Sequence, residues 1–349
     1  MRNPLGVDVE HPRLSWMLKH PQRSQHQRAY RIVVSSTYDL ASRNTGDLWD
    51  SRRVESPATT HISYGGAPLH SGQTCFWRIQ WWDNQDLASD PSDVTTFELG
   101  LLHQTDWKGE WISKKECREF TSKGTVQLGE FLGDYINSYA VYLRKAFKLA
   151  KPVTHARAYV CGLGCYEMRI NGTRIGDRVL DPAQTDFRKI SLYSTYDITR
   201  SLAGLASGKN TGAFAVGVIL GNGRHIKNYG YGHPKAIVQI FVEYDDGTTT
   251  TFVSNKEWRV KHGPLQENGL YFGECYDARL EMPGWDQPEF DDTTWEPALE
   301  AEAYPLSSQL LPPIRVVETR QPKKLSELEG KSQIYDCCQN FSGWVRMSV

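Results

Sequence analysis

The 349-residue sequence has no apolar run approaching the roughly 18 residues that a membrane-spanning helix needs. Its formal net charge is only -1, which argues against a surface for nucleic acid or for an anionic membrane. The first 20 residues lack the apolar core of a signal peptide, so the chain as given carries no export signal. We therefore expect no nucleic-acid partner, no membrane span and, for the chain as given, a cytoplasmic location.

Paired metal-binding and catalytic fingerprints are also missing. The seven cysteines lack the paired C-x-x-C motifs, or the C-x-x-C motif followed by histidines, that a zinc site needs. Their odd number and the length of the chain also argue against a disulfide framework. We expect mostly reduced thiols. The patterns of a P-loop, a zinc protease, a serine hydrolase and a dinucleotide-binding site are absent. The sequence therefore predicts no required cofactor.

Short strand-like runs are what the sequence has in abundance. They are bounded by Gly, Asn, Asp or Pro and span residues 30–36, 76–83, 142–149, 156–162, 166–170, 236–244 and 248–254. Asn171 and Gly172 join two such runs and predict a two-residue hairpin, because both turn positions need a positive φ. Residues 245–247 predict another hairpin. No long amphipathic helical pattern is present, so the predicted fold class is all-β, with tandem β-sandwiches.

Two glycine-rich segments are candidates for ligand contact. In LGNGRH, two glycines flank Asn222 and let the backbone approach a ligand, while Arg224 offers a planar fork of donors to hydroxyl groups. In the following NYGYGHP segment, Tyr229 and Tyr231 alternate with glycines and suit a stacking platform. These four residues form our candidate sugar-binding face. The alternative is that both segments are turns packed on their own sandwich.

The segment GECYDARLEMPGW (273–285) contains two carboxylates that invite an acid–base interpretation, Glu274 and Asp277. Arg279 follows Asp277 by two residues, which favours an ion-paired turn instead. We therefore predict a structural role for Glu274, Asp277 and Arg279 and assign no catalytic residue. The other interpretation is that the segment helps to shape a sugar site.

These motifs together resemble those of bacterial α-L-rhamnosidases, glycoside hydrolase family 78. GECYDAR resembles the family's G-E-x-Y-D-A-R signature, LGNGRH resembles L-G-x-G-W with Arg224 at the Trp position, and the spacing across 155–225 is similar to the family's N-terminal sandwich. The resemblance implies hydrolysis of terminal α-L-rhamnosyl linkages with inversion, by two carboxylates of a helical barrel further along such chains. No residue here matches those two, so the resemblance implies an N-terminal, non-catalytic part whose partner is the missing catalytic domain.

The resemblance also sets the predicted domains. Residues 1–102 would form a fibronectin type III-like sandwich whose first strand is absent, and residues 103–140 a connector with an insertion. Residues 141–300 would form the rhamnosidase N-terminal sandwich. Residues 301–349 would be a linker and the first strands of a third sandwich, too short to bury a core.

The resemblance further implies ligands. Some modules of this type bind terminal rhamnose together with calcium, so rhamnose-containing glycans or glycosides are candidate partners. The candidate calcium ligands are Asp181, Asp186 and Asn222, which supply the oxygen atoms that calcium prefers.

Three alternatives to an ancillary enzyme part stay open. The chain could be a free-standing carbohydrate-binding module, which a rhamnose- or calcium-dependent rise in thermal stability would reveal. A purely structural spacer would show no such rise. A small glycosidase is disfavoured, because no carboxylate pair has a supporting context.

Overall fold

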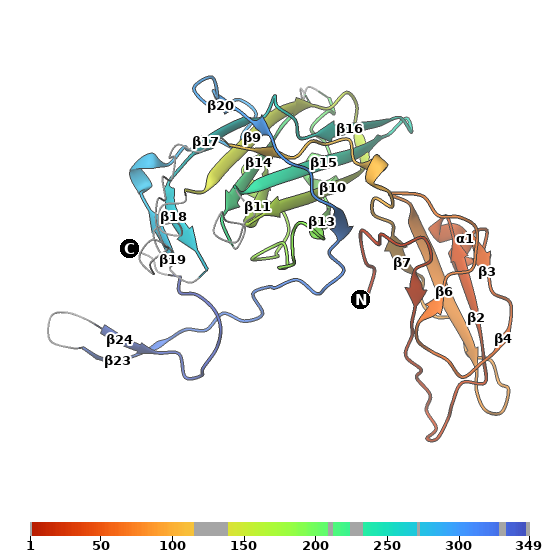
Figure 1. Cartoon of the computed structure of the whole chain (residues 1–349). Coiled ribbons are helices and arrows are strands. Elements are labelled where there is room, and N and C mark those ends of the chain that lie inside the picture. Colours follow the sequence, from red (N-terminus) through yellow and green to blue (C-terminus); the bar gives the residue numbers. More distant parts are fainter. Residues whose placement is uncertain are drawn as a thin grey trace.

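The computed structural model describes residues 2–114, 139–208, 212–223, 233–270, 273–327 and 333–346. The all-β prediction is confirmed, because most strands of these described residues form two sandwiches and their helices, such as α1 (Tyr38–Ser42) and α3 (Thr199–Leu202), are short (Figure 1). Among these residues no helix is long and apolar enough to cross a membrane.

The first body is a small sandwich. Its larger sheet runs in the order β3 (Trp49–Asp50), β2 (Ala29–Ser35), β6 (Thr74–Trp82) and β7 (Thr95–Glu98), with β4 (Val54–Glu55) also paired to β2, and its second sheet pairs β1 (Arg13–Leu14) with β5 (Ile62–Ser63). Along β6, alternate side chains enter the core, where Cys75 and Ile79 are buried and Trp77 is partly buried. The strands thus follow the two-residue period of the sequence.

The second body is a larger sandwich of two sheets. One sheet runs β21 (Leu299–Glu300), β8 (Ile112–Ser113), β15 (Lys235–Tyr244), β10 (Val153–Leu163), β13 (Ser191–Asp197) and β22 (Leu306–Ser308), with β16 (Thr249–Val253) paired to β15. The other runs β12 (Thr173–Arg174), β11 (Cys165–Ile170), β14 (Ala213–Gly221), β9 (Val141–Lys148), β17 (Arg259–His262) and β20 (Glu296–Pro297). Residues such as Ala158, Val160 and Val218 fill the space between them.

Both sheets of this sandwich are also covered on their outer faces. Along β10, Tyr159 and Cys161 alternate with the core residues and pack under the segments around Trp111 and Tyr304. On the other sheet, Tyr142 joins a small outer cluster with Trp295 and its neighbours. This double coverage explains why every residue of β10 from Ala156 to Leu163, and of β15 from Lys235 to Ile240, is buried.

The two predicted hairpins are present. Asn171 and Gly172 have φ values of 46° and 78° and join β11 to β12, and residues 245–247 join β15 to β16. The predicted limits at residues 140 and 300 do not coincide with the edges of the second sandwich. Its larger sheet takes β8 from the predicted connector and β22 from the predicted tail, and β22 lies parallel to β13.

The C-terminal residues leave the sandwich after β22. The Val179 backbone N–H donates to the Ile314 carbonyl at 2.9 Å, and Arg315 pairs with Asp177. Beyond them, β23 (Lys323–Glu327) and β24 (Gln333–Asp336) pair with each other in a hairpin that projects from the sandwich (Figure 1). Exposed apolar side chains are concentrated here: Leu311, Ile314, Val316, Val317, Leu325, Trp344 and Val345.

A buried ion pair joins the two bodies. Arg157 on β10 donates from Nε and Nη2 to the two carboxylate oxygens of Glu98 at the end of β7, at 2.6 and 2.7 Å. Both side chains are buried, and His155 Nε2 lies 3.6 Å from Glu98 Oε2. Nearby, the Leu101 backbone N–H donates to the Tyr193 hydroxyl at 3.0 Å. The interface is therefore polar at its centre, where both carboxylate oxygens of Glu98 accept hydrogen bonds from Arg157.

The surroundings of Glu98 set a pH dependence. Burial alone would raise the pKa of Glu98, but the His155 and Arg157 side chains outweigh burial and leave that pKa lowered. The stability that this lowering contributes is present above the ordinary value of about 4.5 and is lost as the pH falls through the lowered pKa.

We expect Arg157→Met to lower the free energy of unfolding by roughly 3–5 kcal/mol, because it leaves the Glu98 carboxylate buried without its guanidinium. Urea unfolding followed by tryptophan fluorescence measures the change. The matched control is Arg43→Ala, which breaks an exposed pair with Asp39 and should cost no more than about 1 kcal/mol. Equal losses in the two variants would contradict the importance assigned to the buried pair.

Candidate functional site

The loop that contains Asn222 lies against the hairpin of β18 (Leu265–Gly269) and β19 (Gly273–Tyr276). The Asn222 backbone N–H donates to Asn268 Oδ1 at 2.7 Å, and Asn222 Nδ2 donates to the Asn268 carbonyl at 3.3 Å. Asn268 is in turn opposite Glu274 in the hairpin register. The structure thus brings the LGNG loop and the GECYDAR segment together, although about fifty residues separate them in the sequence.

Glycines in this loop permit close backbone packing. A Cβ on Gly223, whose φ is +50°, would lie 2.5 Å from the Gly164 carbonyl oxygen, and one on Gly164 would lie 1.9 Å from the Gly221 oxygen. The glycines therefore let two turns pack directly on one another. This packing agrees with the alternative interpretation of LGNGRH as a turn.

The candidate sugar-binding face is only partly within the described residues. Asn222 is 2% exposed and bonded to Asn268, so its side chain is committed to the hairpin. Arg224, Tyr229 and Tyr231 lie outside the described residues. Sugar contact by these four residues stays a prediction.

Two of the signature residues, Asp277 and Arg279, form a turn directly after β19. Arg279 donates from Nε and Nη2 to the two oxygens of Asp277, at 2.8 and 2.7 Å, so the expected ion pair is present. These bonds lower the pKa of Asp277 to about 2. Asp277 also accepts from the Arg279 backbone N–H at the start of a short 3-10 turn, η3 (Ala278–Leu280), while Glu274 is exposed on β19.

The candidate calcium ligands have different surroundings. Asp181 is buried and accepts hydrogen bonds from Gln309 at 2.9 Å and from Ser194 at 3.0 Å. Asp186 is half-exposed, with Lys189 at 3.6 Å. Within the described ranges, no group of three or more His, Cys, Asp or Glu side chains is arranged to hold a metal ion. Calcium binding therefore stays a prediction, in which calcium would compete with the donors that already satisfy Asp181.

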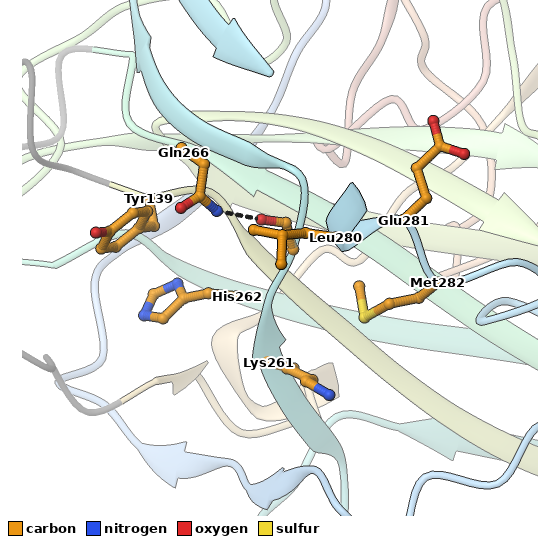
Figure 2. A pocket seen from close by; sticks show the side chains of 8 residues that line it. Tyr139, Lys261, His262, Gln266, Leu280, Glu281 and Met282 are labelled. Carbon is orange, nitrogen blue, oxygen red and sulfur yellow. Dashed lines mark hydrogen bonds between the residues drawn. The ribbon is translucent and has the colours of Figure 1, made fainter. Parts of the chain in front are cut away.

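A pocket of about 430 Å³ lies at the base of the β18–β19 hairpin (Figure 2). It is lined by Tyr139, Lys261, His262, Gly263, Gln266, Leu280, Glu281 and Met282. Three of these are the residues that directly follow the signature. Sequence reasoning missed the pocket, because Tyr139 lies more than a hundred residues before the rest and only Leu280, Glu281 and Met282 belong to a segment that the sequence singles out.

Hydrogen bonds fix several polar groups around the pocket. The Gln266 amide nitrogen donates to the Gly263 carbonyl at 2.6 Å, drawn as a dashed line in Figure 2. His262 Nδ1 lies 3.2 Å from the Ala140 carbonyl and must donate, because a carbonyl oxygen only accepts. Burial lowers the pKa of His262, which favours the neutral ring. The Tyr139 and His262 rings lie 5.1 Å apart, centre to centre, tilted by 50°.

Comparison with known families covers most of the chain. Residues 151–318 match the family model described as the α-L-rhamnosidase N-terminal domain. Residues 1–103 match the model described as the Rha78A-like N-terminal immunoglobulin domain. Both matching models describe N-terminal domains, and together they cover residues 1–103 and 151–318.

Curated and solved relatives agree with these matches. The chain is 33% identical to an α-L-rhamnosidase of Formosa agariphila, over 99% of this chain and 38% of that protein. The solved α-L-rhamnosidase from Dictyoglumus thermophilum superposes with a TM-score of 0.88 at 44% identity, covering 98% of this chain and 38% of that one. The enzyme from Aspergillus terreus gives 0.80 at 27% identity, with 97% and 37% covered.

The chain belongs to the α-L-rhamnosidases of glycoside hydrolase family 78, of which it comprises N-terminal β-domains. It spans about two-fifths of the length of the relatives that it matches.

We expect Asn268→Ala to lower the free energy of unfolding by about 1–3 kcal/mol, because the buried Asn222 N–H loses its bond to Asn268 Oδ1. The matched control is Glu274→Gln, which changes the exposed residue opposite Asn268 in the hairpin and should shift stability by no more than about 0.5 kcal/mol. Urea unfolding of both variants measures the difference. If Asn268→Ala unfolds like the control, the loop does not depend on this bond.

Proposed function

We propose that this polypeptide is the ancillary, non-catalytic part of an α-L-rhamnosidase that hydrolyses terminal α-L-rhamnosyl linkages in glycans or glycosides. The main support for the non-catalytic role is the surroundings of the two signature carboxylates, Asp277 and Glu274. A glycosidase needs two carboxyl groups flanking the scissile bond, one of them an acid with a raised pKa. Asp277 is instead tied to Arg279 with its pKa lowered to about 2, and Glu274 is exposed on a hairpin strand.

The lengths of the relatives support the same proposal. The solved and curated α-L-rhamnosidases that match this chain extend far beyond the part that it covers. The matching family models describe N-terminal domains only. In this proposal the carboxylates that break the glycosidic bond belong to the part of those enzymes that the chain does not cover.

We expect the purified chain to show no turnover of an aryl α-L-rhamnoside, because Asp277, one of the two signature carboxylates, is held in an ion pair by Arg279. Release of the aryl alcohol, followed by absorbance, measures this. Glu274→Gln and, as a control, the exposed Glu289→Gln are assayed beside it. Turnover that co-purifies with the chain and is lost only in Glu274→Gln would overturn the non-catalytic role and favour a small glycosidase.

Weak sugar binding by the second sandwich is the finer part of the proposal. It is supported by the family's sugar-hydrolysing relatives and by the glycine-rich loop at 220–223, beside which Arg224 supplies hydrogen-bond donors. A single sugar offers few apolar atoms, and its hydroxyl groups exchange water bonds for protein bonds at small net gain. Binding should therefore be in the millimolar range.

We expect L-rhamnose to shift NMR signals of the LGNGRH loop, and Arg224→Trp to tighten this binding, because a ring can stack on the sugar where Arg224 cannot. Titrations with and without calcium measure both effects. Asp186→Asn tests the metal, since it removes a charged candidate ligand while leaving the buried Asp181 network intact. The absence of shifts in wild type and in Arg224→Trp, with and without calcium, would favour a structural spacer.

A further inference from the structure

We propose that the pocket at the base of the β18–β19 hairpin binds a neutral saccharide unit. The proposal deepens the sugar binding proposed for the second sandwich, and rests on it. It names a different place from the loop at 220–223, which contacts the hairpin at Asn268 near its tip. The pocket lies where Leu265 and Tyr276 pair at the other end of the hairpin.

Size is the first support for a ligand. The pocket volume of about 430 Å³ falls within the roughly 300–1,000 Å³ that is typical of small-molecule sites. Its lining combines a ring and two apolar side chains, Tyr139, Leu280 and Met282, with the polar side chains of Gln266 and His262 beside Tyr139 (Figure 2). Such a mixture suits a ligand that has both apolar C–H faces and hydroxyl groups.

Hydrogen-bond acceptors are the second support. Because His262 Nδ1 donates to the Ala140 carbonyl, the Nε2 atom of the neutral ring is an acceptor. Because one N–H of the Gln266 amide donates to Gly263, this side chain offers a ligand its carbonyl oxygen and its second N–H. Glu281 adds a carboxylate, one oxygen of which accepts from the Tyr276 hydroxyl at 2.7 Å. Three acceptors around one pocket call for a ligand with several hydroxyl donors.

The balance of charge is the third support. Lys261 and Glu281 line the same pocket and contribute one charge of each sign. A phosphate or carboxylate ligand would gain from Lys261 but would be opposed by Glu281, whereas a neutral ligand can donate to Glu281 and accept from Lys261. A neutral polyhydroxylated ring therefore uses the lining more fully than an anion does.

The signature segment positions one wall of this pocket. The Asp277 backbone N–H donates to the Pro264 carbonyl at 2.9 Å, and the Asp277 side chain begins the η3 turn. Leu280, Glu281 and Met282 follow directly and reach the pocket. The Asp277–Arg279 ion pair thus acts as a positioning device, which gives the signature a role in binding without giving it one in catalysis.

The test is an NMR titration of the whole chain with L-rhamnose, D-glucose and inorganic phosphate, each to tens of millimolar. We expect a sugar to shift the amide signals of Lys261, Gln266 and Leu280. Tyr139→Ala and Gln266→Leu should each weaken this binding about tenfold, through loss of the ring contact or of one acceptor. Glu289→Gln, outside the pocket lining, should leave it unchanged. Thermal melts establish that all three variants fold.

The other outcomes separate this proposal from the proposed function. Sugar shifts confined to residues 220–223 would overturn the pocket and leave sugar binding by the sandwich intact. Phosphate shifts at the pocket that exceed those of both sugars would overturn the neutral saccharide class. No shifts with any ligand would overturn sugar binding at the pocket and at the loop, while the non-catalytic role would still be decided by the rhamnoside assay.

Discussion

The buried ion pair between Glu98 and Arg157 is the constraint on which the arrangement of the chain depends. A carboxylate and a guanidinium removed from water lose several kcal/mol of hydration each, and they regain it only where both ends of the pair are fully bonded. The bidentate geometry supplies those bonds and ties the end of β7 to the middle of β10. Further hydrogen bonds join the two bodies. The Leu101 backbone N–H donates to the Tyr193 hydroxyl, and Asp8 accepts from the Ser307 hydroxyl and the Ser308 backbone N–H.

Different segments cover the two outer faces of the second sandwich. One face is covered by Trp111, Tyr304 and the approach from the first domain. The other carries the β18–β19 hairpin, on which the Asn222 loop and the signature segment meet. Because Leu265 of the hairpin joins Tyr142 of β9 and Ile219 of β14 in a small outer apolar cluster, the candidate ligand surfaces are held by the sandwich without interrupting its core.

The all-β class, the Asn171–Gly172 hairpin and the Asp277–Arg279 pair were predictable because each depends on residues adjacent in sequence. Strands of two or three residues, such as β8 and β22, were not, since no period can be read from so few positions. The burial of Asn222 was not predictable either, because flanking glycines suit both a turn that approaches a ligand and a turn that packs on its neighbour. The pocket was not predictable from the sequence for a further reason. Tyr139 and His262 come together only through the pairing of β9 with β17.

The late position of β22 has a consequence for synthesis on the ribosome. The first sandwich closes largely within its own hundred residues, so it can fold while the rest is still being translated. The second sandwich cannot finish, because β13 waits for a partner strand more than a hundred positions downstream and Asp8 waits for Ser307 and Ser308 about three hundred positions away. Its nascent form therefore presents an open sheet edge at β13 until residue 308 has left the exit tunnel.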